Sequence, residues 1–182
     1  MIIFKCRITG DEMLSDAYKI NPVIGDDGEE VPGLMEIESQ IVAKGGEEID
    51  IGGGDAFGGG GADEAVDDTI EKVNNVIDES LGFGYTECPM GKKDLKDYLQ
   101  AYCKQVRGLL KDDPKIEGPA VKAFTQSAGA FCKFLLTKAS DLEFFMTPAF
   151  NPEGSMAFSY YKDGALAPTF VYITMGLLEE KC

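Results

Sequence analysis

The side chains of this sequence that could do acid–base chemistry are carboxylates, because it contains 32 Asp and Glu residues and no histidine. Without an imidazole there is no Ser-His-Asp or Cys-His nucleophile system and no histidine metal ligand. Paired carboxylates such as Asp11 and Asp16, or Asp26 and Asp27, are the remaining candidates for a general acid and base. Neighbouring carboxylates are far more often surface charge, and no spacing selects one pair. We therefore predict that the protein is not an enzyme.

The same carboxylates could bind calcium, which takes six to eight oxygen ligands. However, no EF-hand loop is present, because placing Gly28, Gly118, Gly154 or Gly164 at the invariant glycine of that loop leaves other ligand positions wrong. We expect any calcium site to be weak and assembled from distant segments. The alternative is diffuse attraction of counter-ions to an acidic surface.

The cysteines are odd in number, scattered and without a C-x-x-C pair, which argues against a disulfide framework and against a zinc site; they are Cys6, Cys88, Cys103, Cys132 and Cys182. Cys103 and Cys132 are predicted to be small core residues. Cys182 is predicted to be exposed, where oxidation could link two otherwise monomeric chains through an intermolecular disulfide.

The element that organises the rest of the chain is a predicted helical hairpin over residues 92–138. Asp112-Asp113-Pro114 ends the first helix, because proline disfavours the α conformation in the residue before it. Gly118-Pro119 begins the second, since proline is tolerated at the first helical position. Gaps of three and four place the apolar residues on one stripe of each helix; these are Leu95, Tyr98, Leu99, Tyr102, Val106, Leu109 and Leu110, then Val121, Phe124, Ala128, Phe131 and Leu135.

This hairpin is basic, whereas the rest of the chain is acidic. Ten basic and five acidic residues give it a net charge of +5, so the remainder of a chain with a total of −15 carries −20. Such an asymmetry can be used by partners. The basic residues that we single out as candidates for binding are Lys92, Lys93, Lys96, Lys104, Arg107 and Lys111.

Strands are predicted on both sides of the hairpin, which gives an α+β fold of a single domain over residues 1–182. Alternating apolar residues predict strands over residues 1–8, 34–43 and 156–160. A short strand is predicted over residues 18–20 and a returning strand over residues 169–174, while residues 142–146 are an apolar segment. Residues 10–16 are predicted to be a polar turn, and residues 22–33 a hairpin loop. Residues 69–81 fit either a helix or a strand.

Residues 45–68 are predicted to be a mobile acidic loop, because they are rich in glycine and carboxylates and poor in apolar groups. Their glycines are not followed by the Lys-Ser/Thr of a phosphate-binding loop, so no nucleotide cofactor is expected. The net charge of −15 opposes nucleic-acid binding. No apolar run approaches the roughly 20 residues of a membrane span, and the N-terminus lacks the layout of a signal peptide. We expect a cytoplasmic protein.

Several motifs, taken together, resemble the translationally controlled tumour protein (TCTP) family across essentially the whole chain. They are Met1-Ile2-Ile3-Phe4, residues 11–20, Ile51-Gly52-Gly53-Gly54, Phe144-Phe145, Asn151-Pro152-Glu153-Gly154, Tyr161-Lys162-Asp163-Gly164 and Glu180-Lys181-Cys182. Two positions depart from the family pattern. Thr147-Pro148 stands where Gly-Glu is common, and Thr174-Met175 replaces a usual Lys-Asp. Both changes remove carboxylates.

The resemblance implies a β-tent core of mostly antiparallel strands with a projecting helical hairpin, and it favours a strand over residues 69–81. It also implies partners: calcium, tubulin or microtubules, Ras-like small GTPases and apoptosis-regulating proteins, with a role in growth or survival. For calcium, the candidate ligands are Asn151, Glu153 and Asp163. For a small GTPase, whose nucleotide exchange the protein would regulate, the candidates are Glu12, Asp11 and Asp16; the alternative role for Glu12 is a turn-capping carboxylate.

Overall fold

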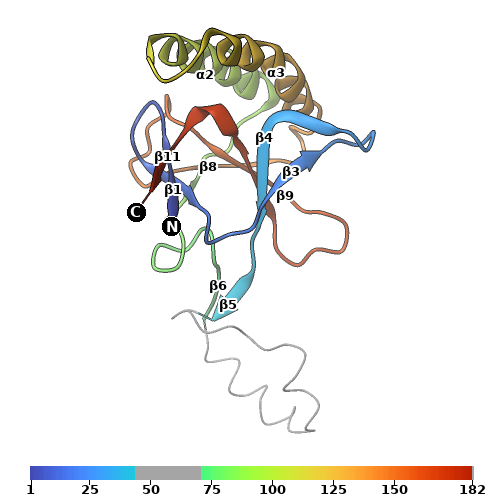
Figure 1. Ribbon diagram of the computed structural model, residues 1–182. Helices are drawn as coiled ribbons and strands as arrows, with labels where there is room; N and C mark the ends of the chain where they lie inside the picture. The colour runs from blue at the N-terminus through green and yellow to red at the C-terminus, as the bar shows by residue number, and fades with distance from the viewer. Residues whose placement is uncertain (44–70, 182) are drawn as a thin grey trace, which may run out of the picture.

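Two antiparallel helices lie along one side of a β body in the computed structural model, which describes residues 1–43 and 71–181 (Figure 1). Helix α2 (Lys92–Asp112) ends before Pro114, and helix α3 (Gly118–Thr137) begins at Gly118-Pro119. The predicted stripes form the buried faces, since Leu95, Leu99, Tyr102, Val106 and Leu110 of α2 are buried against Val121, Phe124, Phe131 and Leu135 of α3 and the sheet. The prediction of the hairpin is confirmed.

The described strands form three antiparallel sheets. They are β1 (Ile2–Cys6), β2 (Glu12–Ser15), β3 (Ile20–Ile24), β4 (Glu30–Glu38), β5 (Ile41–Ala43), β6 (Lys72–Asn74), β7 (Thr86–Glu87), β8 (Glu143–Met146), β9 (Ala157–Tyr160), β10 (Thr169–Ile173) and β11 (Leu177–Lys181), with a short 3₁₀ helix η2 (Thr174–Gly176). The sheet orders are β11-β1-β2, β3-β4-β10-β9-β8-β7 and β5-β6. This arrangement confirms the predicted α+β class.

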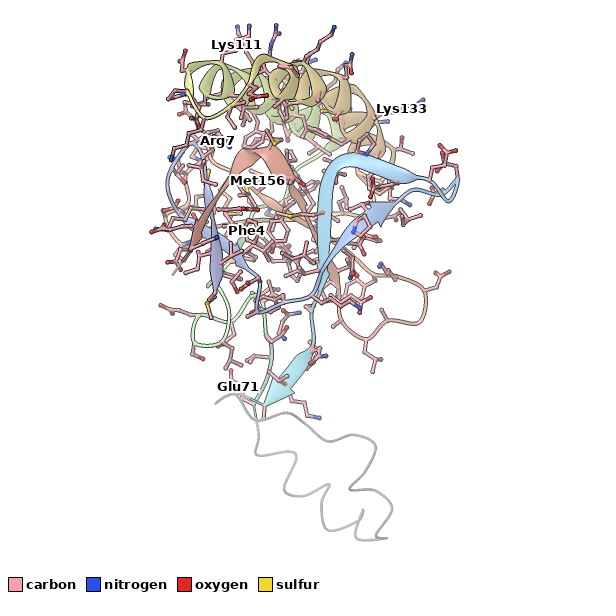
Figure 2. All side chains as sticks on the ribbon, viewed as in Figure 1. Phe4, Arg7, Glu71, Lys111, Lys133 and Met156 are labelled. Carbon is pink, nitrogen blue, oxygen red and sulfur yellow. The ribbon has the colours of Figure 1, made fainter. Side chains whose placement is uncertain are left out.

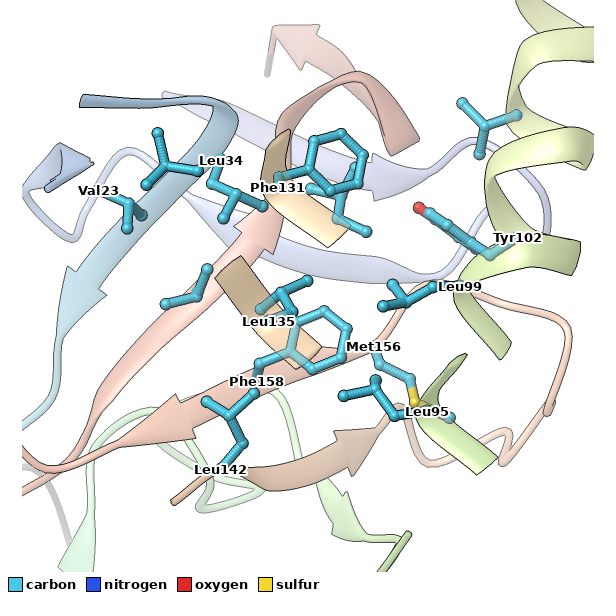
Figure 3. Close-up of a cluster of buried hydrophobic side chains, with 14 of the residues drawn as sticks. Val23, Leu34, Leu95, Leu99, Tyr102, Phe131, Leu135, Leu142, Met156 and Phe158 are labelled. Carbon is cyan, nitrogen blue, oxygen red and sulfur yellow. The ribbon is translucent and has the colours of Figure 1, made fainter. Parts of the chain in front are cut away.

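The six-stranded sheet is buried on both faces. Successive residues of a strand point to opposite faces, and here they enter different cores: Phe144 packs toward the hairpin and Phe145 toward the three-stranded sheet. Val171 and Tyr172 of β10 are divided in the same way. Figure 3 shows the core on the hairpin side, where Phe131 and Leu135 of α3 meet Leu34 and Phe158. The layers are therefore helices, large sheet and small sheet.

The predicted turn over residues 10–16 is wrong, because Glu12–Ser15 forms strand β2. Met13 and Leu14 are both fully buried, and β2 pairs with β1. Two consecutive apolar residues, preceded by Glu12 and followed by Ser15, carry no period-2 pattern. Pairing with a strand elsewhere in the sequence decides the conformation here.

The loop predicted over residues 22–33 is also too long, because only a tight turn separates β3 from β4. The Gly25 amide donates to the Glu29 carbonyl at 2.8 Å, and Gly28 has a φ of 80°. Pro22 lies within β3, at the edge of the six-stranded sheet, where its missing N–H leaves no gap in the ladder. The proline and acidic residues predicted a loop where the ends of β3 and β4 form.

The predicted strand over residues 34–43 is split between two sheets, β4 and β5. The ambiguous segment 69–81 contains β6, which pairs with β5, and continues as turns within its described part. Asn74 accepts hydrogen bonds from the amides of Val76 and Ile77, which closes the first of these turns. Strand β11, which the sequence did not predict, pairs with β1 and places the two ends of the chain side by side (Figure 1). The predicted acidic loop, residues 45–68, and Cys182 lie outside the described residues.

Arg7 joins the tip of the hairpin to the body. Its Nε donates to the Met175 carbonyl at 3.0 Å, and its Nη1 lies 3.3 Å from a carboxylate oxygen of Asp113, just after α2. The guanidinium is almost entirely buried between these partners, so the turn after β1, η2 and the hairpin loop share one polar contact.

Candidate functional site

A basic stripe runs along the outer face of α2. It consists of Lys93, Lys96, Lys104, Arg107 and Lys111, which the helical repeat places within about a quarter of a turn of each other. All five are exposed, and none makes an ion pair within the described residues. At about 1.5 Å per residue the stripe is roughly 27 Å long. Figure 2 shows Lys111 on the outer side of the hairpin, away from the β body.

Two open grooves between α2 and α3 border this stripe. The first, here called the lysine groove, measures about 670 Å³ and is lined by Lys92, Lys93, Lys96, Gly129, Cys132, Lys133, Leu136 and Thr137. The second, the tip groove, measures about 400 Å³ and is lined by Arg107, Lys111, Ile116, Gly118, Val121, Lys122 and Thr125. Each groove combines cationic rims with an apolar or neutral floor. Such surfaces suit an acidic peptide better than a compact ion.

Lys138, at the end of the hairpin, differs from these residues. Its Nζ lies 3.0 Å from Asp26 Oδ1 and 5.6 Å from the ring centre of Phe134. Asp26 of the candidate acid–base pair is therefore ion-paired with Lys138. Asp27, the other member, accepts a hydrogen bond from the amide of Glu29. The carboxylates of this pair therefore have separate structural partners.

The candidates for a GTPase contact lie around β2, an edge strand of the small sheet. Asp11 Oδ2 accepts hydrogen bonds from the hydroxyls of Thr9 at 2.8 Å and Thr147 at 3.1 Å. Asp16 Oδ1 accepts from the amide of Ile2 at 3.0 Å. The exposed carboxylate of Glu12 makes no hydrogen bond or ion pair with the described residues. Asp11 is thus the turn-stabilising carboxylate, and Glu12 is available to a partner.

The calcium candidates do not come together as one site. Asn151 and Glu153 share a turn before β9, in which Asn151 Oδ1 accepts from the Glu153 amide at 3.0 Å. Asp163 follows β9, at the opposite end of that strand. No cluster of three or more acidic or cysteine side chains suited to a metal occurs in residues 1–43 and 71–181. Asn151 and Glu153 therefore lie before β9, and Asp163 lies after it.

Glu36 was missed by the sequence analysis. It is only 2% exposed, accepts from Tyr160 Oη at 3.1 Å and pairs with Lys162. With these residues it lines a hollow of about 880 Å³ between β3, β9 and the end of α3. No local pattern distinguishes a buried glutamate from the exposed Glu38 two residues later. The burial of Glu36 is explained by its ion pair with Lys162, a residue far along the chain.

The chain is similar to known proteins over its whole length. The family model described as "Translationally controlled tumour protein" matches residues 1–178. The chain belongs to the TCTP family. A solved structure of the translationally controlled tumor-associated protein p23fyp from Schizosaccharomyces pombe is 27% identical, with a TM-score of 0.72 and complete coverage of both chains. The Caenorhabditis elegans TCTP structure shares the fold, at 24% identity and a TM-score of 0.63, over 100% of this chain and 99% of the other.

Membership of the TCTP family confirms the resemblance drawn from the sequence motifs. It does not by itself distinguish among tubulin, a small GTPase and calcium as partners. Among the described helices, none is long and apolar enough to cross a membrane.

Proposed function

We propose that this TCTP-family protein is a non-enzymatic cytoplasmic interaction protein whose basic hairpin binds the acidic tails of tubulin. The observation that carries this proposal is the stripe of five exposed basic residues on α2, without ion-pair partners among the described residues. Charge runs on helices are usually solvated faces that only confer solubility. This stripe differs because two grooves with apolar floors border it, and a peptide can bury side chains there.

The attraction should depend on salt, because exposed charges interact over a Debye length of about 8 Å at physiological ionic strength. The acidic body, with a net charge of −20 outside the hairpin, repels an acidic tail. Repulsion from the body therefore favours binding on the hairpin, whose buried inner face leaves only the outer face for contact.

The first prediction concerns charge reversal at the start of α2. We expect Lys92→Glu/Lys93→Glu/Lys96→Glu to abolish co-sedimentation with polymerised tubulin at low salt. The variant should fold, because negative charges near a helix N-terminus are favourable. The matched control is Lys19→Glu/Lys72→Glu/Lys181→Glu, which changes the net charge equally at exposed positions off the hairpin. Equal binding by the two variants would refute the proposal.

A second candidate function, an accessory role toward a Ras-like small GTPase, is favoured by Glu12. Its carboxylate is exposed on an edge strand, while Met13 and Leu14 beside it are fully buried and hold the backbone. The neighbouring Asp11 is fixed by Thr9 and Thr147. Such an arrangement presents one carboxylate on a rigid strand. Through this contact the protein would regulate nucleotide exchange without covalent chemistry.

The second prediction tests this role. We expect Glu12→Val to lose any acceleration or inhibition of nucleotide release from a Ras-like GTPase, measured with a fluorescent nucleotide. Glu179→Val is the control, because Glu179 is exposed on β11, at the opposite edge of the same sheet. A Glu12→Val variant as active as the parent would remove Glu12 from the contact.

For calcium we propose only diffuse association with the acidic body, since the candidate ligands lie at opposite ends of β9. The tubulin experiment is therefore repeated with and without calcium. Association of this kind predicts no saturable heat in titration calorimetry at physiological salt.

A further inference from the structure

Cys103 of α2 and Cys132 of α3 face each other across the hairpin, with their Sγ atoms 3.8 Å apart. Each thiol is half-buried beside a fully or almost fully buried aromatic residue, Tyr102 and Phe131 respectively. A disulfide needs the two sulfurs at about 2.05 Å, so they must approach by only about 1.8 Å. Rotation of the side chains and a small shift of two packed helices can supply this movement.

Cys132 also lines the lysine groove, together with Lys92, Lys93, Lys96 and Lys133. This thiol is therefore reached through an opening with four cationic side chains. A small anion that enters the groove is held close to the Cys132 sulfur. Both cysteines were predicted as core residues. The packing of the two helices instead brings them together at a basic opening.

We propose that Cys103 and Cys132 form a dithiol–disulfide site, oxidised by a small anionic disulfide of the glutathione class that docks in the lysine groove. The lysine groove is also part of the proposed tubulin-binding surface. The thiol chemistry, however, does not depend on either proposed function. Cys132 is the attacking thiol and Cys103 the resolving thiol.

The reaction is a double thiol–disulfide exchange. The Cys132 thiolate attacks one sulfur of oxidised glutathione, forms a mixed disulfide and releases one glutathione thiolate. The Cys103 thiolate then attacks Cys132 Sγ, forms the Cys103–Cys132 disulfide and releases the second glutathione thiolate. Two protons leave the protein thiols and are taken up by the two glutathione molecules. The protein loses two electrons, and the glutathione disulfide gains them.

The assignment of roles agrees with the surroundings of the two thiols. The hydrogen bond between them lowers the pKa of Cys132 below its ordinary value, and the same bond, with burial, raises the pKa of Cys103. Since the thiolate is the nucleophile, and Cys132 rather than Cys103 lines the lysine groove, Cys132 reacts first. Once Cys132 is in a mixed disulfide, the stabilised thiolate on that side is gone and Cys103 is the thiol left to resolve it.

The other described cysteines lack this arrangement. Cys6 is buried, and its sulfur accepts hydrogen bonds from the amides of Thr9 and Ser155. Cys88 is half-buried and makes no sulfur–sulfur contact with the other described cysteines. The pair on the hairpin is therefore the place in residues 1–43 and 71–181 where an intramolecular disulfide can form without rearrangement of the fold.

The experiment incubates the reduced full-length chain with oxidised glutathione and digests it with trypsin without reduction. Cleavage after Lys96, Lys104, Lys122 and Lys133 yields peptides 97–104 and 123–133, which mass spectrometry should find linked and separable by dithiothreitol. Cys103→Ser should instead accumulate a glutathione adduct on Cys132. Absence of the linked peptide, or an equally fast adduct on Cys103 in Cys132→Ser, would overturn the proposal.

The role of the groove is tested with variants in which neutral glutamine replaces three lysines. Lys92→Gln/Lys93→Gln/Lys96→Gln should slow oxidation by glutathione disulfide severalfold, yet leave unchanged the rate with hydroxyethyl disulfide, a neutral probe. The matched control Lys111→Gln/Lys115→Gln/Lys122→Gln removes the same charge at the hairpin tip and should oxidise like the parent. Equal slowing by both variants, or equal slowing with both probes, would overturn the docking of the anion in the lysine groove.

Discussion

At the scale of single residues, Thr147 changes the surroundings of the candidate GTPase surface. The family pattern that the sequence motifs resemble commonly has glycine at this position, and glycine has no hydroxyl to donate. Here Thr147 is 6% exposed and its hydroxyl donates to Asp11 Oδ2, alongside that of Thr9. Asp11, the residue before Glu12, is thereby hydrogen-bonded to the loop after β8. A departure from the family pattern thus supports the edge strand that carries Glu12.

The third prediction is that Thr147→Val lowers the free energy of unfolding by about 1–2 kcal/mol, because it removes a buried hydrogen bond to a carboxylate and keeps the shape. Urea denaturation measures the change. Thr137→Val is the control, since Thr137 is exposed and its hydroxyl bonds only to the carbonyl one turn earlier, so about 0.5 kcal/mol or less is expected. Equal effects would mean that the bond to Asp11 contributes nothing.

At the scale of elements, the hairpin is held against the large sheet where β4 passes under α3. Gly33 has a φ of 83°, and a Cβ there would lie 2.7 Å from a ring carbon of Phe131, which is itself fully buried. The close approach of strand and helix needs both the positive φ and the missing side chain. This contact fixes the helices that carry both grooves and both thiols of the redox pair.

The fourth prediction compares Gly33→Ala with Gly28→Ala. Gly28 has a φ of 80° but open space where a Cβ would lie, so its substitution should cost only the about 1–2 kcal/mol of left-handed backbone. Gly33→Ala should cost about 1–3 kcal/mol more, because the methyl group overlaps the Phe131 ring. Urea denaturation of both variants measures the difference. Similar costs would show that the strand and helix can separate freely at this point.

At the scale of the whole molecule, buried and half-buried tyrosines are spread through both cores. Burial is the main cause that raises the pKa of six of them, namely Tyr18, Tyr85, Tyr98, Tyr102, Tyr160 and Tyr172. Tyr85 and Tyr172 also share a hydrogen bond of 2.8 Å between their hydroxyls. The neutral phenol is therefore the form that the folded protein keeps on both sides of the central sheet.

The fifth prediction concerns alkaline pH. In the unfolded chain a tyrosine ionises near pH 10, whereas the folded protein holds it neutral at higher pH. The contribution of these tyrosines to stability is thus fully present below about pH 10 and is lost as the pH rises above it. Each of the buried tyrosines Tyr85, Tyr102 and Tyr172 contributes a slope of about 1.4 kcal/mol per pH unit. The half-buried Tyr18 and Tyr160 contribute less, because solvent screens them. Tyrosinate absorbance, recorded with the unfolding transition, measures this.

The control for this prediction is Tyr98→Phe, which removes one ionising group from the hairpin side and its hydrogen bond to the Gly154 carbonyl. Above about pH 10, the unfolding free energy of this variant should fall less steeply with pH than that of the parent, by the slope that one tyrosine contributes. If most tyrosines of the folded parent instead ionised near pH 10, the burial of the phenols would not govern alkaline stability.

The sequence by itself determined the helical hairpin, its limits and its charge. Apolar spacing, Pro114 and Gly118-Pro119 act within a few residues, so the local chain specifies α2 and α3 without help from the rest. The turn after β9 and the strand that returns from it were predicted for the same reason. The family motifs added the overall fold, which no local pattern could supply.

Only the tertiary structure decided which short segments become strands and which side chains meet. Strands β2 and β11 form because β1 lies between them, and their own residues show no clear alternation. Glu36 is buried because Lys162, distant in sequence, reaches it. Cys103 and Cys132 become a pair because two helices pack antiparallel in one particular register. In each case the stabilising contact joins residues far apart in the chain, and the distance between them is set by packing.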